Sequence, residues 1–387
     1  MWGIREDRPY IIAIITLYVV INLWLHIMLN TPPAGGYEIS IYNVYSPLFW
    51  FLFILIIVLG IGLTIPFRVR GVNLWRYSLT AILIVDTVVL FLPMIRGYEF
   101  YALAGSDIFA HLAWSEFITN TGHIMGGDHY PATHILMTVL KQLSLFNPAI
   151  LAIVVPFLFF ILYILSLFLL GRTIYSDNMA GALFSLVGSP LLFTLGHYDF
   201  YPFVFALLLF PLIFYSMHKI EVPSNREMYY ICFVILSLFI VFCHPLTSII
   251  LILTLGVLYG YSQISNKYRL RFPCRPNILN MIAIVGITFV FWYTHFWGIL
   301  KMGENVISAL LGGSDKATIL TSNLELVEQS GLPVLRIAEV FIKNYGSMII
   351  YFIVALLIVI YLAKGFLIRR KYADEMAYVT FFLLSIA

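Results

Sequence analysis

Two residues with side chains suited to catalysis lie close together in the stretch GSDIFAHL, Gly105 to Leu112, which places Asp107 and His111 four positions apart. Residues at this spacing share one face of a helix. The carboxylate could act as a general base on a hydroxyl group, and the imidazole could bind a phosphate group, an acceptor or a metal ion. Asp107 could also simply cap a helix, because Asp is favoured immediately before an apolar-periodic run.

The same segment continues with the turn-rich sequence GGDHYP, which contains Asp128 and His129, and then with His134 one turn into a second predicted helix. Such a turn can fold Asp128 and His129 back toward Asp107. A divalent cation, Mg²⁺ or Mn²⁺, could then be held by Asp107, Asp128 and His111, since hard cations favour carboxylates and imidazole suits Mn²⁺. Asp beside glycines is also ordinary turn chemistry, so a purely structural role stays open.

Further candidates lie in two short turns and in a later loop. The turn GHYDFYPF presents two titratable side chains two positions apart, the turn CHPLT presents a histidine, and the later loop contains an arginine. An arginine can grip a phosphate group by bidentate hydrogen bonds, although a solvated surface role is equally open. The candidate substrate-binding residues are His129, His134, His197, Asp199, Tyr201, His244 and Arg336.

The chain that carries these residues has the composition of a polytopic membrane protein. Of its 387 residues, 61% are hydrophobic and 11% are charged, against about 25% charged residues in soluble domains. Apolar runs of roughly 17 to 25 residues are long enough for a helix to cross the hydrocarbon core. The sequence predicts an all-α bundle of ten, eleven or more transmembrane helices. The ten runs are 9–30, 45–66, 77–95, 148–170, 179–195, 202–218, 229–244, 247–263, 278–297 and 346–363.

The distribution of Lys and Arg predicts the orientation of the chain, because basic residues favour the cytoplasmic side. Placing the N-terminus in the cytoplasm puts most of the 22 Lys and Arg residues on that side and most of the histidines outside. An N-terminal hairpin (1–76) is then predicted to precede the main transmembrane module (77–387), whose long outer loops span 96–147 and 298–345. An eleventh apolar run opens at Met376 and is too short to span, so we expect the C-terminal part of the chain to be missing.

The first outer loop is predicted to form two amphipathic helices along the membrane surface, because its apolar residues recur at helical spacing. The first helix is expected to begin at Asp107 or the serine before it and to stop at Gly122. The second is expected to run from Pro131, or the alanine after it, to Leu145. These helices would position Asp107 and the histidines at the outer ends of the spans.

The stretches GSDIFAHLAWSEFI, TGHI and YPATHIL together resemble the GT-C superfamily of membrane glycosyltransferases, which includes oligosaccharyltransferases, protein mannosyltransferases and aminoarabinose transferases. The resemblance covers residues 96–145 and, more loosely, the hydropathy layout. It implies transfer of a sugar from a polyprenyl-phosphate-linked donor to a glycan, lipid or protein acceptor on the extracytoplasmic face, with Asp107 as the acid of the first large outer loop. The sequence departs from the pattern in two ways: the loop follows the third span, and no Asp-x-Asp pair is present, which leaves metal dependence open.

Two other classes of protein stay open. A transporter or flippase of lipid-linked glycans would place key polar groups near the bilayer midplane, where this sequence has Asp86. The other class is a non-catalytic membrane scaffold. Nucleic acid is not an expected partner, because topology explains the basic residues and no basic stripe with interleaved aromatics occurs in the sequence.

Overall fold

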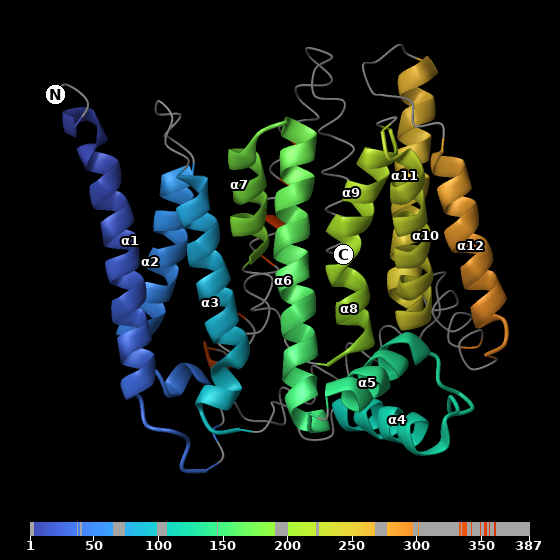
Figure 1. Cartoon of the computed structure of the whole chain (residues 1–387), viewed down its shortest axis with the longest axis horizontal. Coiled ribbons are helices and arrows are strands. Elements are labelled where there is room, and N and C mark those ends of the chain that lie inside the picture. Colours follow the sequence, from blue (N-terminus) through green and yellow to red (C-terminus); the bar gives the residue numbers. More distant parts are fainter. Residues whose placement is uncertain are drawn as a thin grey trace. The chain divides into compact units, whose positions relative to one another are not determined.

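The computed structural model shows a chain built of α-helices (Figure 1). No strand occurs within the residues that the structure describes, so the predicted all-α transmembrane bundle is confirmed. The described residues are 4–36, 38, 41–64, 74–98, 107–144, 146–189, 200–221, 224–267, 277–296, 301, 333 and 335–338, and the single positions 342, 349, 352, 353, 356 and 360.

Six helical segments of the described chain are long and apolar enough to cross a bilayer. Five are continuous helices, and the sixth consists of two helices in direct succession, α8 and α9. A multi-pass membrane protein follows from these segments alone. Their bounds are α1 (Ile4–Asn30), α2 (Pro47–Thr64), α3 (Trp75–Ile95), α6 (Pro148–Tyr175), α8 (Pro202–Leu208) with α9 (Phe210–Ile220), and α10 (Arg226–Cys243).

Three of the ten predicted spans are represented by shorter apolar helices, namely α7 (Asn178–Gly188), α12 (Ile278–Tyr293) and the apolar part of α11 (Pro245–Lys267). Helix α7 has 11 residues, which corresponds to about 16 Å at the usual rise per residue. The described helix ends at Gly188, and the sequence Gly-Ser-Pro at 188–190 favours a helix end there, since glycine and proline both disfavour a helix interior. The predicted span 346–363 lies outside the described residues except at isolated positions.

The chain divides into two compact units. The first comprises Met1–His123, His134–Leu192 and Gly196–Leu236, and the predicted N-terminal hairpin falls inside it. The second comprises Ile124–Thr133, Phe193–Leu195 and Ser237–Ala387. The candidate residues are therefore distributed over both units, and each unit is described by itself.

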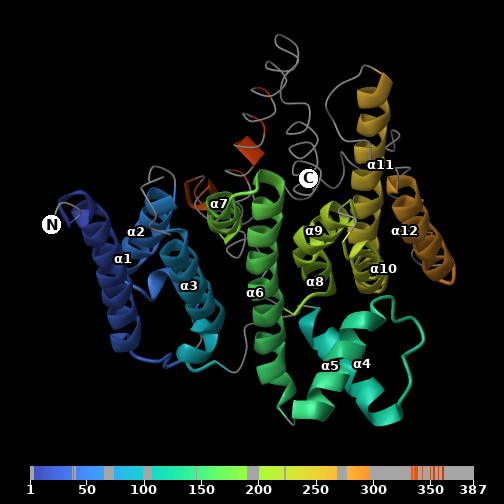
Figure 2. The ribbon, with the colours of Figure 1, turned by 45° about the horizontal axis from the view of Figure 1, so that its top comes forward.

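In the first unit, α1, α2, α3, α6 and α7 run side by side (Figures 1 and 2). Helix α7 lies very close to α6 because glycine residues of α7 face α6. A Cβ atom added at Gly181 would lie 2.6 Å from the carbonyl oxygen of Phe168, and one added at Gly188 would lie 2.2 Å from a methyl group of Leu167. Such small residues allow two helix backbones to approach closely within a membrane.

Helices α4 (Ile108–Thr121) and α5 (Pro131–Ser144) lie across the ends of α6 and α8 (Figures 1 and 2). The buried side of α5 carries Met137, which packs with Leu151 of α6 and with Phe205 of α8. Helix α4 ends at Gly122, whose φ of 71° is a left-handed conformation that glycine adopts without strain. The predicted bounds of both helices are confirmed to within one residue, whereas α4 does not gather its apolar residues on one face: His111 and Ser115 are buried and Phe109 is exposed.

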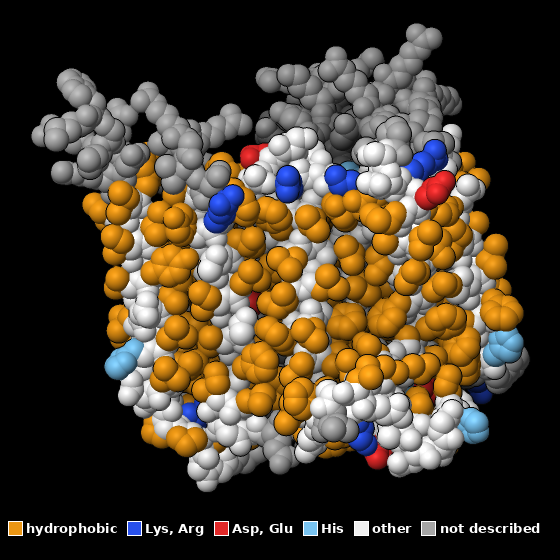
Figure 3. Space-filling view, in the orientation of Figure 1, with side chains coloured by type: hydrophobic (Ala, Val, Ile, Leu, Met, Phe, Trp, Pro, Cys, Tyr) orange, Lys and Arg blue, Asp and Glu red, His pale blue; other side chains and the backbone are white. Residues whose placement is uncertain are grey.

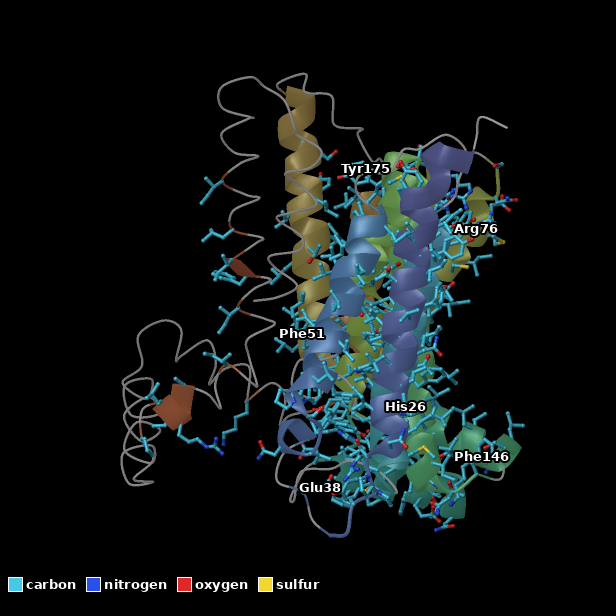
Figure 4. All side chains as sticks on the ribbon, turned by 90° about the vertical axis from the view of Figure 1, so that its left-hand side faces the viewer. His26, Glu38, Phe51, Arg76, Phe146 and Tyr175 are labelled. Carbon is cyan, nitrogen blue, oxygen red and sulfur yellow. The ribbon has the colours of Figure 1, made fainter. Side chains whose placement is uncertain are left out.

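The surface of the helices is that of a protein surrounded by lipid. Figure 3 shows hydrophobic side chains over the middle of the helices and Lys and Arg side chains near their ends. Phe51 of α2 is 59% exposed. Figure 4 shows Arg76 and Tyr175 at one end of the first unit's helices and His26 and Glu38 near the other end. Charged residues at the ends and exposed apolar residues between them are typical of membrane spans.

Candidate functional site

The carboxylate of Asp107 lies at the N-terminus of α4 and is exposed. Asp107 occupies the N-cap position, but its backbone is in the right-handed helical region (φ −65°, ψ −12°) and its side chain makes no capping hydrogen bond. A true cap has extended backbone angles and accepts a hydrogen bond from the first turn. Of the two interpretations offered by the sequence, side-chain capping is therefore not realised.

Next to Asp107 on the same helix, His111 forms a buried pair with His134 of α5. The Nδ1 atom of His111 lies 2.9 Å from the Nε2 atom of His134, and the two rings are 6% and 0% exposed. Both residues belong to the first unit. Because both atoms are ring nitrogens, one must donate and the other must accept. Only one proton can lie between the two facing nitrogens, so the two rings cannot both be cationic while the bond persists.

Aromatic side chains surround the histidine pair. The ring of Trp114 meets the His134 ring edge to face, with centroids 5.1 Å apart, and the ring of Tyr201 meets the His111 ring edge to face at 6.2 Å. Tyr201 was predicted as a candidate, whereas Trp114 was not. Its position three residues after His111 in the same helix was the available signal, since residues three apart lie on one face.

The pair is fixed by the packing of α4 against α5. The hydroxyl group of Thr138 donates to the carbonyl oxygen of Ser115 at 2.9 Å, and Lys141 forms an ion pair with Glu116. The hydrogen bond from Lys141 lowers the pKa of the Glu116 carboxyl group. His134 is completely buried, so in this arrangement it can influence a ligand only through His111 and not by direct contact.

In the second unit, Asp128 is 2% exposed, and its side chain stabilises the turn in which it lies. Its Oδ1 atom accepts a hydrogen bond from the backbone N–H of Tyr130 at 2.8 Å, and its own N–H donates to the carbonyl oxygen of Met125. Gly127 precedes it with a φ of 95°, which suits glycine. This is the Asx turn that the sequence GGDHYP favours, so the structural alternative for Asp128 is realised.

The turn places His129 and Tyr130 against other aromatic rings of the second unit. The Tyr130 ring stacks on the His244 ring at 5.8 Å with an interplanar angle of 22°. The His129 ring meets the Phe296 ring at 4.4 Å, and no hydrogen-bond partner for its buried Nδ1 atom lies within the described part of the chain. Burial lowers the pKa of His129, and the nearby Asp128 carboxylate partly opposes this. The arrangement brings His129, Tyr130 and His244 into one aromatic cluster.

His244 caps helix α11. Its Nδ1 atom accepts a hydrogen bond from the N–H of Thr247 at 3.3 Å and lies 3.0 Å from the Thr247 hydroxyl oxygen. A ring nitrogen that accepts from a backbone N–H carries no proton, so the neutral ring carries its proton on Nε2. Burial lowers the pKa of His244 to about 4. His244 is therefore neutral at physiological pH.

The remaining candidates are less well defined. Arg336 lies on the helical turn 335–338 of the second unit and is exposed. His197 and Asp199 lie outside the described residues. Phe296, which contacts His129, was not predicted, and an aromatic residue at the end of an apolar run gives no signal that separates it from the many interfacial aromatics.

The predicted divalent-cation site does not appear among the described residues. No group of three His, Cys, Asp or Glu side chains in that part of the chain could hold a metal ion. Of the candidate ligands, Asp107 and His111 belong to the first unit and Asp128 to the second.

Comparisons with known proteins give no relative from which to transfer a function. The chain matches no protein-family model, no curated protein and no solved structure.

Proposed function

We propose that the protein is a membrane glycosyltransferase that moves a sugar from a polyprenyl-phosphate-linked donor to a glycan, lipid or protein acceptor on the extracytoplasmic face. One observation carries the proposal: the exposed Asp107 carboxylate at the start of helix α4 is not used as a helix cap. An acid that the fold does not use as a cap, at the membrane surface, is suited to act on a bound acceptor.

In the proposed reaction, Asp107 removes the proton from the acceptor hydroxyl group. This requires its carboxylate to lie within about 2.6 to 3.2 Å of the acceptor oxygen. The acceptor oxygen forms a bond to the anomeric carbon of the sugar, while the bond from that carbon to the lipid phosphate oxygen breaks. The electron pair of the broken bond leaves on the phosphate, and the acceptor proton remains on Asp107.

The histidine pair suits the other half of this chemistry. A ring that shares one proton with its neighbour can present an N–H to an anionic oxygen, and charge-assisted hydrogen bonds of this kind are strong. His111 is the ring of the pair nearer to Asp107 in the chain and on the same helix. We propose that His111 donates a hydrogen bond to an oxygen of the leaving phosphate and that His134 holds the His111 ring in place. The residues His129, His244 and Arg336 remain sequence-based candidates for binding the donor.

The test is sugar transfer by the purified protein in detergent, with short-chain polyprenyl-phosphate sugars as donors. Asp107→Asn keeps the size of the side chain and removes the base, so transfer is expected to fall by about 10² to 10⁴-fold. Asp177→Asn is the matched control, because Asp177 is also an acid at a helix N-terminus but its carboxylate does accept a capping hydrogen bond, from the N–H of Met179. Equal activity of wild type and Asp107→Asn would refute the proposal.

A second candidate, a transporter of lipid-linked glycans, is favoured by one observation, the burial of Asp86 in the middle of α3. Ionisable residues inside a span mark function by default. Movement of a fluorescent lipid-linked glycan across liposomes containing the protein, without any change in the glycan, would favour this candidate over sugar transfer.

A further inference from the structure

Asp86 is an acidic residue in the interior of the first unit, far from the charged ends of its helix. It lies in the middle of α3, and its side chain is 0% exposed. The hydroxyl group of Ser189, just after α7, donates a hydrogen bond to its Oδ1 atom at 2.6 Å. Its Oδ2 atom is buried and has no hydrogen-bond partner within the described residues. One oxygen of this carboxyl group is therefore satisfied and the other is not.

The helices packed around Asp86 offer no positive charge to pair with it. Helices α2 and α7 contain no Lys, Arg, His, Asp or Glu along their described lengths. On α6, the group within electrostatic range of Asp86 is Tyr163, and Arg172 lies in the last turn of that helix. On α1, Tyr18 faces Tyr77, which is near the start of α3. Within the described residues, the titratable group that interacts with Asp86 is thus a phenol and not a cation.

A carboxylate in such a place has no adequate compensation for the water that it loses. Burying an ionised group in an apolar medium is far more costly than burying a neutral polar group, and buried acids respond by taking up a proton. A single hydroxyl donor does not replace the water molecules that surround a charged carboxylate in solution. A neutral carboxylic acid, by contrast, accepts the Ser189 hydroxyl on Oδ1 and carries its proton on Oδ2.

We propose that Asp86 is a proton-binding site within the membrane-spanning part of the protein, with the proton on Oδ2 and the Ser189 hydroxyl bonded to Oδ1. This inference does not depend on sugar transfer. A proton needs one oxygen, and Oδ2 offers it. Na⁺ would need several oxygens around it, and within the described residues no hydrogen-bonding group lies beside Oδ2.

The site links α3 to the residue that follows α7, and these two helices are in contact. Loss of the proton would leave a carboxylate between α3 and the end of α7, and this charge could be relieved only by water or by movement of one helix away from the other. Proton binding at Asp86 therefore keeps α7 against α3. A transport cycle or a regulatory transition that separates these helices would be coupled to release of this proton.

The test is infrared spectroscopy of the whole protein in liposomes of phosphatidylcholine and phosphatidylglycerol at neutral pH. A protonated carboxyl group absorbs in a region separate from carboxylates. Asp86→Asn should remove this band, and Asp177→Asn, which removes a partly exposed carboxylate, should leave it. Ser189→Ala should shift the band to higher frequency, because it deletes the hydrogen bond to Oδ1.

The proposal would be overturned if the wild-type spectrum lacked the protonated-carboxyl band or if the band survived Asp86→Asn. It would also be overturned if the band disappeared when choline chloride is replaced by sodium chloride, because that result would assign the site to Na⁺. If Asp86→Asn does not fold, Ser189→Ala in protein labelled with ¹³C-aspartate decides the question, since an unshifted band would mean that the protonated acid is another residue. None of these measurements requires sugar transfer, so failure of the proposed enzyme activity would leave this test intact.

Discussion

The Nδ1 atom of His111 lies 2.9 Å from the Nε2 atom of His134, so that one hydrogen bond between two buried rings joins α4 to α5. The two residues are 23 positions apart in the sequence. One of the two facing nitrogens donates and the other accepts, and through this bond His134 orients a ring that follows Asp107 by one helical turn.

His134→Leu should destabilise the protein by about 1 to 3 kcal/mol, because it leaves a buried nitrogen of His111 without this partner. The double variant with His111→Leu should lose less than the sum of the two single variants, since replacing both partners by apolar groups removes the unsatisfied nitrogen. Thermal unfolding in detergent of the wild type, both single variants and the double variant measures this coupling. Additive losses would show that the two rings do not interact.

Two acidic residues that both precede helices should respond differently to removal of the carboxyl group. Asp177 accepts a hydrogen bond from the N–H of Met179 at 3.1 Å and has extended backbone angles, whereas Asp107 makes no such bond. Asp177→Ala should therefore cost about 0.5 to 2 kcal/mol, and Asp107→Ala should cost much less. The comparison uses the unfolding midpoint in detergent. An equal loss at the two sites would mean that Asp107 does stabilise α4, and it would weaken the assignment of a catalytic role.

How much could be predicted from the sequence depended on whether the signal was local. The bounds of α4 were predictable, because Asp107 and Gly122 mark its ends within the sequence and Gly122 adopts the left-handed conformation that ends a helix. The Asx turn at Asp128 was also anticipated from its glycine neighbours. Both features arise from residues only a few positions apart.

The features that the sequence did not predict depend on residues that are distant in the chain. The bond between His111 and His134 and the complete burial of His134 follow from the packing of α5 on α4. A helix-end role for His244, which precedes Pro245, was one of two interpretations open from the sequence, but its hydrogen bond with the Thr247 N–H was not predictable because histidine is not among the residues favoured as caps. Among the described residues, three of the predicted spans are shorter apolar helices, and apolar composition alone does not separate such a helix from a full span.

The close packing of α7 on α6 predicts a sharp difference between two glycines. Gly181→Ala should destabilise the protein by about 1 to 3 kcal/mol, because the new Cβ atom would lie 2.6 Å from the Phe168 carbonyl oxygen and backbone would have to move. Gly62→Ala in α2 is the matched control, since nothing lies within 4 Å of its Cβ position. There alanine should be neutral or stabilising by up to about 1 kcal/mol, through its higher helix propensity. Unfolding midpoints in detergent would test both, and a tolerated Gly181→Ala would contradict the described packing.

The buried ring of His244 predicts a loss of stability in acid. Its pKa is lowered to about 4, against 6.5 for an unperturbed histidine, so the folded state keeps the ring neutral while the unfolded state takes up a proton. The contribution of the neutral His244 ring to the free energy of unfolding is complete above about pH 6.5 and is lost as the pH falls toward 4. The lowered pKa of His129 changes the stability in the same direction. The total loss from His244 is about 3 kcal/mol, from 1.36 kcal/mol per pKa unit. His244→Asn should keep a side chain that can cap α11 and should flatten the dependence of the unfolding midpoint between pH 7 and pH 4. A dependence as steep as that of the wild type would show that other groups are responsible.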